Sequence, residues 1–470
     1  MPIQVTIIGA GPGGYVAALR AAQKGARVIV VEHAEIGGTC LNQGCIPTKT
    51  LIASAEALEH VRHAGDLGVD IVGQVGYSLK KIRERKDKVV KTQIKGIHSL
   101  FKSWGVTVIE GRGSLISPDI VRIVKKDGTT MDVRSDKVII ATGSRPAKSP
   151  DFPFDQENLI TSDEAVKLQT IPRSLLIIGA GVIGSEFAFI YRTFGSEVTM
   201  VEMMGHAVST EDEEISEILE RELKKAKIKL ITNVKVDGVM RSEGMMIARL
   251  SNGEEIRAET ILVSIGRSLN TEQLGLEDVG VKTGTRGEIL VNDHMETSVP
   301  GIYAVGDVTG KLLLAHVASH QGITAVENAL GGEEAMDYST VPAGIFTRPE
   351  IGSVGLREKQ AVEKGIRYCV GRFPYRALGR AHAGGEIVGM VKIISDEITD
   401  KVLGVHICGA HATDLIHEGA LAISLGATSH QLGNMIHAHP TFAEAVMEAA
   451  EDVHRHAVHV PRPTDNKPAI

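Results

Sequence analysis

The feature that most constrains the fold is a strand–turn–helix–strand pattern that occurs twice, in "VTIIGAGPGGYVAALRAAQKGARVIVVE" and in "LLIIGAGVIGSEFAFIYRTFGSEVTMVE". Each copy has an apolar strand, the spacing Gly-x-Gly-x-x-Gly, a helical stretch ended by a glycine, and a second buried strand that ends in glutamate. The first glycine and the glutamate are equally spaced in the two copies. The pattern residues are Gly9, Gly11, Gly14 and Glu32, then Gly179, Gly181, Gly184 and Glu202. The repeat predicts two nucleotide-binding units, each built on a parallel sheet.

The glycines and the glutamate have separate tasks in such a unit. The first glycine makes the tight turn, the second lets a pyrophosphate approach the backbone, and the third lets the helix pack against the strands, so that the helix N-terminus faces the phosphates. Glu32 and Glu202 are expected to accept hydrogen bonds from ribose hydroxyls. Because a carboxylate repels a 2'-phosphate, Glu202 favours NAD over NADP. Glycine-rich turns without a ligand are the alternative, and the repetition argues against them.

Two units imply two dinucleotides. A nicotinamide enzyme needs one unit, so the other is expected to bind FAD. In "TSVPGIYAVGD" a short apolar strand delivers Asp307 at its carboxyl end, where open α/β sheets bind ligands. In "DKVIIATGSRP" another strand ends at Thr142 and Gly143, and this element is expected to link the FAD and NAD units. Ala315 is assigned to the FAD site, and Gly266 to the NAD site.

Changes in the pattern of predicted strands and helices divide the chain into four segments. Residues 1–145 and 267–337 are expected to be two parts of an FAD-binding domain, and 146–266 an NAD-binding domain. Residues 338–470 are expected to be an α+β domain, with an antiparallel sheet followed by helices. The predicted fold class is therefore α/β, with two Rossmann-like domains and a C-terminal α+β domain. A long charged helix, Tyr77 to about Lys102, is interpreted as a solvated face.

Composition excludes several classes of protein. The net charge is −7, with 51 Lys and Arg against 58 Asp and Glu, and no basic stripe predicts nucleic-acid binding. No apolar run reaches the ~18 residues of a membrane span. The N-terminus reads as a core strand rather than a signal peptide. We expect a cytoplasmic protein, or one of the mitochondrial matrix after removal of a presequence.

The segment "GGTCLNQGCIPTKTLI" holds two of the 4 cysteines. Residues five apart in a regular helix have Cα atoms ~8–9 Å apart, whereas a disulfide tolerates about 7 Å. Cys40 and Cys45 can therefore form a disulfide only if the backbone between them turns. Pro47 suits a first helical turn, which puts Cys45 near the positive helix end and lowers its thiol pKa. Lys49 follows one turn later on the same face.

A redox pair explains these cysteines better than the alternatives do. Zinc needs four ligands, and Cys369 and Cys408 stand alone in strand-like runs, where a buried cysteine acts as a small apolar residue. A structural disulfide across five residues closes too small a loop to stabilise much. No metal site is expected.

The cysteine segment, the two glycine patterns and "YAVGD" together resemble the pyridine nucleotide–disulfide oxidoreductases, over essentially the whole chain. The resemblance implies that Cys45 is the sulfur beside the flavin and that Cys40 is the interchange sulfur that meets the substrate. It also implies that Lys49, assigned to the FAD site, pairs with Glu186 near the flavin.

The segment "HAHPTFAEAVMEAA" contains the candidate catalytic base, His439. His439 precedes a proline and is expected just outside a helix that begins at Pro440. Glu444 falls in the first turns and can orient and charge-stabilise the imidazole. A dithiol must lose a proton before it attacks a disulfide, and such a histidine can accept it near neutral pH. The other histidines of this region are expected to be surface or satisfied residues; they are His411, His417, His430 and His437.

Within the family, "PYRALGRAHAGGEIVGMVKI" and "HAHPTFAEA" resemble the branch that oxidises protein-bound dihydrolipoyl groups with NAD+. This implies a homodimer in which residues 338–470 form the interface and dimerisation domain and the His–Glu dyad serves the other subunit's active site. The partner is expected to be a lipoyl-bearing protein of a 2-oxo acid dehydrogenase complex or glycine cleavage system, on a separate chain because no lipoyl segment precedes Met1. One departure is "AHVASHQG", since the family usually has an acid near Gln321. The alternatives are a reductase of another small disulfide, or a sensor that binds FAD and NAD without turnover.

Overall fold

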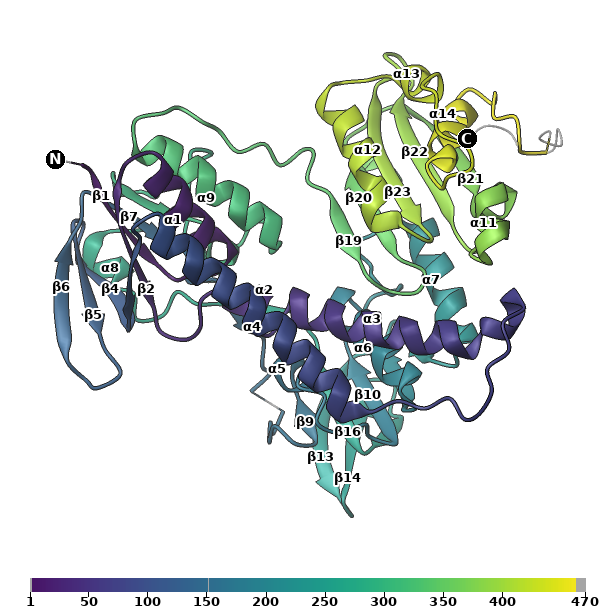
Figure 1. Ribbon diagram of the computed structural model, residues 1–470, viewed down its shortest axis with the longest axis horizontal. Coiled ribbons are helices and arrows are strands. Elements are labelled where there is room, and N and C mark those ends of the chain that lie inside the picture. The colour runs from purple at the N-terminus through teal and green to yellow at the C-terminus, as the bar shows by residue number, and fades with distance from the viewer. Residues whose placement is uncertain (1, 151, 462–470) are drawn as a thin grey trace. The chain divides into compact units, whose positions relative to one another are not determined.

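The structure, a computed structural model, describes residues 2–150 and 152–461 (Figure 1). The chain divides into two compact units. Unit 1 comprises residues 1–58, 76–170 and 263–337. Unit 2 comprises residues 59–75, 171–262 and 338–470. Within the described residues, no helix combines the length and the apolar character that crossing a membrane requires.

Unit 1 is built on a five-stranded sheet with the order β18-β7-β1-β2-β3, in which all neighbours are parallel. Its strands are β1 (Gln4–Ile8), β2 (Arg27–Glu32), β3 (Thr107–Glu110), β7 (Lys137–Ile140) and β18 (Ile302–Ala304). The central strands are short apolar runs, and Val5, Ile7 and Ile139 are fully buried. Such strands suit a parallel sheet that is covered on both faces. The predicted strand–turn–helix–strand unit is thereby confirmed.

Helices α1 (Pro12–Gln23) and α9 (Ala315–Ala329) pack closely in unit 1 although they are far apart in sequence. In Figure 1 the green α9 lies beside the purple α1. A Cβ added to Gly322 would lie 2.5 Å from the carbonyl oxygen of Gly13. Arg20 of α1 also donates to Glu327 of α9 at 2.7 Å. Glycine at this crossing thus lets the two backbones touch.

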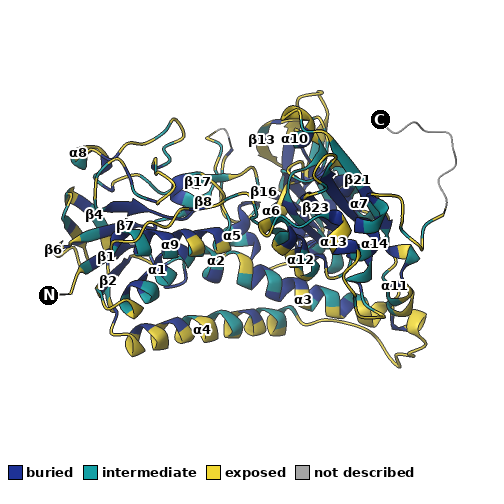
Figure 2. Ribbon diagram, turned by 90° about the horizontal axis from the view of Figure 1, so that it is seen from above, coloured by how far each residue is buried: buried dark blue, intermediate teal, exposed yellow. Residues whose placement is uncertain are grey.

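The predicted charged helix is α4 (Leu79–Ser103), which begins two residues later than expected because the Ser78 hydroxyl accepts the Lys81 N–H and caps the first turn. Figure 2 shows its long exposed face. The remaining elements of unit 1 are α2 (Gly38–Asn42), α3 (Cys45–Arg62, continuing into unit 2), β4 (Arg112–Ser117), β5 (Ile120–Val124), β6 (Thr130–Arg134), β8 (Ser144–Pro146), β9 (Leu159–Ile160), α5 (Ser162–Ala165), β17 (Arg267–Leu269), α8 (Leu276–Val279) and the 3-10 turn η2 (Asp307–Thr309).

Unit 2 repeats the parallel arrangement and adds an antiparallel layer. Strands β12 (Lys229–Ile231), β11 (Glu197–Val201), β10 (Ser174–Ile178) and β16 (Thr260–Val263) lie side by side in that order, and β13 (Val236–Ser242), β14 (Met245–Leu250) and β15 (Glu255–Ala258) form a second sheet. The helices here are the turn η1 (Ala64–Leu67), α6 (Val182–Thr193) and α7 (Glu213–Lys225). Together β10, α6 and β11 form the second predicted nucleotide-binding unit.

The C-terminal part of unit 2 is the antiparallel sheet expected beyond residue 338. Its order is β19-β20-β23-β22-β21, and neighbouring strands pair antiparallel. The strands are β19 (Ala343–Ile345), β20 (Ile351–Gly355), β21 (Tyr368–Pro374), β22 (Met390–Asp396) and β23 (Val402–Cys408). The helices are α10 (Glu358–Glu363), η3 (Tyr375–Ala377), α11 (Gly379–Gly384), α12 (Ala412–Ser424), α13 (Ser429–Gly433) and α14 (Glu444–Asp452). Apolar side chains of η3, α11, α12, α13 and α14 form one core with the sheet.

Candidate functional site

The first glycine turn is shaped to admit a phosphate. Gly9 has φ +102°, a left-handed conformation that favours glycine. A Cβ at Gly14 would lie 2.0 Å from the Gly9 carbonyl oxygen, so the third glycine is needed for close packing. At Gly11 the nearest atom to an added Cβ is 3.8 Å away, and α1 begins at Pro12 without a side-chain cap. The first-turn N–H groups are thus left for an anion.

The second glycine turn has the same geometry. Gly179 has φ +98°, and no atom lies within 4 Å of a Cβ added to Gly181. Helix α6 also begins, at Val182, without a side-chain cap. The donor set and the open second glycine of each turn therefore fit a dinucleotide pyrophosphate.

The two predicted ribose-binding glutamates are held alike. Glu32, at the end of β2, accepts the Ala10 N–H at 2.7 Å, and Glu202, after β11, accepts the Ala180 N–H at 2.7 Å. Each carboxylate also accepts the N–H of the residue two positions later, at 2.8 Å and 2.9 Å respectively. A carboxylate has about four acceptor sites, so the remaining ones can serve ribose hydroxyls.

The cysteine segment breaks its helix between the two sulfurs, as its sequence predicted. Helix α2 ends at Asn42 and α3 begins at Cys45, with Cys40 inside α2. Cys40 is half-buried, and Cys45 is exposed. The hydrogen bond with Cys45, together with burial, raises the pKa of the Cys40 thiol, although the Lys49 charge acts in the opposite direction. Cys40 therefore keeps its proton and can donate it to the other sulfur.

This cysteine segment lies directly against the first glycine turn. The Gly37 N–H donates to the Ala10 carbonyl at 2.8 Å. Gly38 has φ +59°, and a Cβ added there would lie 2.5 Å from the Cα of Gly11. The structure thus brings the cysteine pair and the predicted FAD turn together within unit 1.

Asp307 belongs to a polar network that sequence reasoning only partly identified. The Ser144 hydroxyl donates to Asp307. Arg267 Nε donates to the Ser144 hydroxyl at 2.6 Å and lies 3.7 Å from the Asp307 carboxylate. Ser144 and Arg267 were missed, although each directly follows a glycine that was assigned to a cofactor site, Gly143 and Gly266. The network fixes Asp307 at the carboxyl end of the parallel sheet.

Three further predicted positions of unit 1 lie near this edge. Thr142 exchanges hydrogen bonds with Asn270: its hydroxyl donates to the Asn270 carbonyl at 2.7 Å, and the Asn270 side-chain amide donates to the Thr142 carbonyl at 2.9 Å. Ala315 is the first residue of α9, which has no side-chain cap. Gln321, the departure noted in the sequence, is fully buried and accepts the Gly306 N–H at 2.6 Å. Gln321 therefore holds the loop that carries Asp307.

The predicted contact between His439 and Glu444 is formed, but the helix that carries Glu444 starts later than expected. Helix α14 begins at Glu444 rather than Pro440. The intervening turn folds back on the helix end, because Thr441 donates its N–H to Glu444 at 2.8 Å and its hydroxyl to the Ala438 carbonyl at 2.7 Å. His439 Nδ1 lies 2.8 Å from Glu444 Oε1, and the His439 side chain is 76% exposed. An exposed imidazole on an anchored carboxylate suits a proton acceptor.

The electrostatics of Glu444 agree with this arrangement. Burial acts to raise the pKa of Glu444, but the hydrogen bonds from His439 and from the Thr441 N–H outweigh it, and the pKa is lowered. The carboxylate is therefore ionised near neutral pH and can orient the imidazole through the contact at Nδ1.

The structure does not join all of the predicted pairs. Lys49 lies in unit 1 and Glu186 in unit 2, so their pairing stays a prediction. Glu186 is buried in α6 and accepts the Phe346 N–H at 3.0 Å. The cysteine pair and His439 likewise belong to different units, and their meeting stays a prediction. The two lone cysteines lie in strands β21 and β23, as expected.

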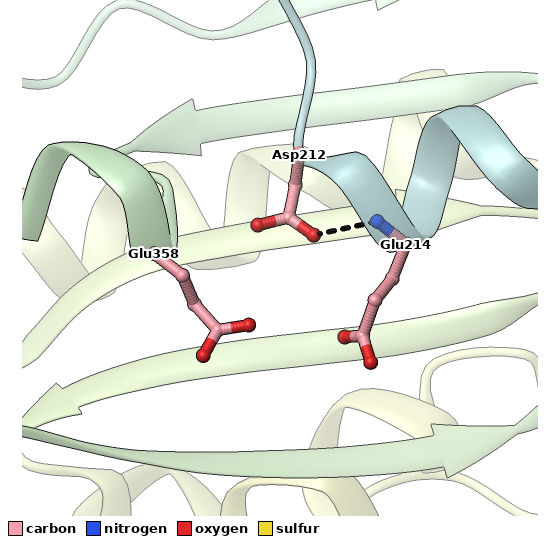
Figure 3. A group of neighbouring side chains, drawn as sticks. All are labelled: Asp212, Glu214 and Glu358. Atoms are coloured by element: carbon pink, nitrogen blue, oxygen red, sulfur yellow. Dashed lines mark hydrogen bonds between the residues drawn. The ribbon is translucent and has the colours of Figure 1, made fainter. Parts of the chain in front are cut away.

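A cluster of carboxylates in unit 2 is a charge cluster rather than a binding site. Asp212, Glu214 and Glu358 converge between α7, α10 and the antiparallel sheet (Figure 3). The ammonium of Lys392, whose side chain is 1% exposed, lies 2.7 Å from Asp212 and 2.7 Å from Glu214 and pairs with Glu358. Arg372 adds a second cation, 2.9 Å from Glu214. The acidic oxygens are thus already neutralised by side chains.

Comparisons with known proteins agree with this geometry. Residues 3–322 match the family model described as pyridine nucleotide-disulphide oxidoreductase, and residues 341–450 match the dimerisation domain of that family. The chain is 40% identical to a dihydrolipoyl dehydrogenase of Chlamydia pneumoniae (97% of this chain, 98% of the relative). It is 43% identical to one of Bacillus subtilis (97% and 98%). The crystal structure of LpdA from Mycobacterium tuberculosis superposes with a TM-score of 0.90 at 32% identity (96% of this chain, 99% of that one).

The matches cover both units, the two dinucleotide turns and the cysteine segment lie inside the first matched range, and the His–Glu dyad lies inside the second. The chain therefore belongs to the pyridine nucleotide-disulphide oxidoreductase family, and it is an oxidoreductase that uses FAD and NAD.

Proposed function

We propose that the chain oxidises protein-bound dihydrolipoyl groups and transfers the electrons through FAD to NAD+. The observation that carries the proposal is the contact of the cysteine segment with the first glycine turn, at Gly38 and Gly11. This contact puts a dithiol beside a dinucleotide cradle. The dihydrolipoyl dehydrogenases named above support the choice of substrate, and Glu202 supports NAD.

The thiol chemistry is assigned to three residues. His439, oriented by Glu444, takes the proton of one substrate thiol, and the resulting thiolate attacks Cys40 of the oxidised enzyme. The Cys40–Cys45 bond breaks, and Cys45 leaves as a thiolate. The second substrate thiol then attacks the substrate sulfur that is bonded to Cys40, which closes the lipoyl disulfide and releases Cys40. Cys40 takes the first proton from His439 as it leaves, and His439 then accepts the proton of the second thiol. The electron pair has thereby passed to the cysteines, with Cys40 as a thiol and Cys45 as a thiolate.

The remaining residues bind and orient. FAD, when bound, carries the electron pair onward to NAD+, and re-formation of the Cys40–Cys45 disulfide restores the enzyme. Asp307, Ala315 and the first glycine turn would hold FAD; the second glycine turn and Gly266 would hold NAD. Lys49 and Glu186 would form a pair near the flavin. Because the pKa of Cys40 is raised, Cys45 is the sulfur of the pair that can carry the thiolate, which supports placing Cys45 beside the flavin.

The dimerisation domain supports a homodimer in which the His439–Glu444 dyad of one subunit serves the cysteine pair of the other. We assign FAD binding to residues 1–145 and 267–337, NAD binding to 146–266, and dimer contacts to 338–470. The partner would be a lipoyl-bearing protein of a 2-oxo acid dehydrogenase complex or glycine cleavage system.

The proposal is tested by replacing Cys45 with serine and following the dihydrolipoamide-dependent reduction of NAD+. Turnover should be abolished while FAD stays bound, because the serine hydroxyl cannot form the disulfide. Cys369→Ser in β21 is the matched control and should turn over normally. Turnover by the Cys45 variant would refute the assignment. Faster turnover by wild type with NADH and glutathione disulfide than with the lipoyl substrates would refute the substrate.

A further inference from the structure

His437, two residues before the proposed base, is held by acceptors on both ring nitrogens. Its Nδ1 lies 2.8 Å from the Met435 carbonyl oxygen, and its Nε2 lies 2.7 Å from Glu418 Oε1. The His437 side chain is 3% exposed and that of Glu418 is 21% exposed. The ring of His437 therefore has a hydrogen-bond partner at each nitrogen, as expected from the sequence, and both partners are oxygen acceptors.

The partners define the protonation state of the ring. A backbone carbonyl and an ionised carboxylate can only accept hydrogen bonds, and a neutral imidazole has a single N–H to donate. Both hydrogen bonds therefore require the imidazolium form. The hydrogen bond to Glu418 is the main cause that raises the pKa of His437, and burial opposes it; the Met435 carbonyl and the charges of Glu418 and Glu444 raise it further.

This ion pair fixes one side of the segment that carries His439. Glu418 belongs to α12, so the pair ties the chain at residue 437 to that helix. On the other side, the Thr441 N–H is tied to Glu444 of α14. His439 lies midway between the two anchors, and its own side chain is largely exposed. The base is thus positioned by its backbone and by Glu444, with few packing contacts of its own.

We propose that His437 is a positioning residue: as an imidazolium bound by Glu418 and the Met435 carbonyl, it fixes the backbone from which His439 presents its imidazole. The inference rests on the proposed role of His439 as the base. Because the anchor needs the charged ring, it is complete below the folded pKa of His437 and is lost as the pH rises through it. The charged groups that face the ring are Glu418 from α12 and Glu444 from α14, and His439 is the other titratable group of its segment.

Activity should therefore fall as the pH rises, because deprotonation of His437 loosens the segment that carries His439. His437→Lys keeps a cation with several donors, so it should retain much of the activity, and the fall of kcat at alkaline pH should shift to higher pH. The glutamine of His437→Gln is uncharged and does not titrate, so the fall of kcat that His437 causes at alkaline pH should be absent.

The experiment compares wild type, His437→Gln, His437→Lys and the control His417→Gln, which changes an exposed histidine of α12. In His437→Gln, kcat with dihydrolipoamide should fall about tenfold to a hundredfold. The reduction of ferricyanide by NADH, which needs no thiol base, should stay unchanged. Amide hydrogen exchange of a peptide spanning residues 435–441 should become faster in His437→Gln than in the control.

Three results would overturn the inference. The first is that His437→Gln leaves both kcat and the amide hydrogen exchange of residues 435–441 unchanged, and the second is that it lowers the dihydrolipoamide and ferricyanide activities equally. The third is that kcat falls at the same alkaline pH in wild type and in both His437 variants. If wild type itself failed to oxidise dihydrolipoamide, the proposed function would fall instead, and the exchange measurement would still decide whether His437 anchors the segment.

Discussion

Gly38 lies against Gly11 so closely that a Cβ on Gly38 would stand 2.5 Å from the Cα of Gly11. One residue belongs to the cysteine segment, and the other is the glycine whose N–H side faces the expected pyrophosphate. Neither backbone can move without disturbing the other. The distance between the redox sulfurs and the cofactor turn is therefore set by main-chain contact rather than by adjustable side chains.

Gly38→Ala should weaken FAD binding. The new Cβ meets backbone atoms that cannot rotate away, and a positive φ costs a non-glycine residue about 1–2 kcal/mol. We expect purified Gly38→Ala to retain much less flavin than wild type, measured as the ratio of flavin to protein absorbance after dialysis. Gly25→Ala is the matched control, since Gly25 also has a positive φ (+84°) but no atom within 4 Å of the added Cβ. Equal flavin loss in both variants would show that the contact is unimportant.

Glu202→Gln should narrow the preference for NAD over NADP. The variant removes the charge that repels a 2'-phosphate, and it leaves one of the two backbone N–H donors without its acceptor. An unsatisfied donor costs about 1–3 kcal/mol, so kcat/KM with NADH should fall about tenfold or more. The ratio of kcat/KM for NADH and NADPH measures the effect. Glu32→Gln, which changes the same geometry in the FAD unit, should leave that ratio as it is.

His439→Gln should remove the thiol base while sparing the rest of the reaction. General base catalysis contributes about 10²–10⁴-fold, so kcat with dihydrolipoamide should fall by this order. Reduction of ferricyanide by NADH should continue at the wild-type rate. His430→Gln, at an exposed histidine that contacts Asn434, should leave both activities unchanged. A similar decline in both assays would point to structural damage instead.

Lys392→Met should strongly destabilise unit 2. The substitution keeps the apolar length of the side chain but leaves Asp212, Glu214 and Glu358 without their central cation. Breaking a buried ion pair on one side costs about 3–5 kcal/mol, measurable as a lower urea midpoint at pH 7. Arg367→Met removes an exposed partner of Glu397 and should change the midpoint little. An unchanged midpoint in Lys392→Met would contradict the role of the cluster.

The same cluster predicts opposite pH dependences for wild type and Lys392→Met. Burial tends to raise the pKa of Asp212 and of Glu214. The hydrogen bonds and charge of Lys392, joined at Glu214 by those of Arg372, outweigh burial, and both pKa values are lowered. The two carboxylates therefore stabilise the folded wild type at pH values above their unfolded pKa values of about 3.9 and 4.3. This stabilisation is lost as the pH falls through their lowered pKa values in the folded state. In Lys392→Met, Arg372 still pairs with Glu214, but burial dominates at Asp212, so the variant should gain stability as the pH falls from 7 to 5. Urea midpoints of wild type and Lys392→Met, measured from pH 7 to pH 5, show whether stability changes with pH in opposite directions in the two proteins.

The sequence was sufficient for features that depend on neighbouring residues. Glycine at fixed spacing, strand-length apolar runs and a terminal acid predicted both dinucleotide turns, because each requires a local backbone shape. The break between Cys40 and Cys45 could be predicted for the same reason, since a helix cannot bring residues five apart within bonding distance. The antiparallel sheet of the C-terminal part also followed from short β-branched strands.

Features that depend on distant partners could not be predicted in this way. The start of α14 at Glu444 follows from a turn in which Thr441 uses the glutamate itself as its acceptor, and the proline rule does not include that competition. Ser144 and Arg267 became visible only when two separate strands met beside Asp307. The pairing of His437 with Glu418 likewise needs α12 in place. Each of these depends on tertiary pairing rather than on spacing.

The packing of α9 on α1 has a consequence for the order in which this protein is completed during synthesis. Unit 1 takes its last segment, residues 263–337, from beyond the whole of the second parallel sheet. The glycine turn near the N-terminus is translated first, yet the helix that presses on it through Gly322 emerges some three hundred residues later. A nascent chain can therefore fold the second nucleotide-binding unit before the first is finished, and flavin capture must await the return of the chain.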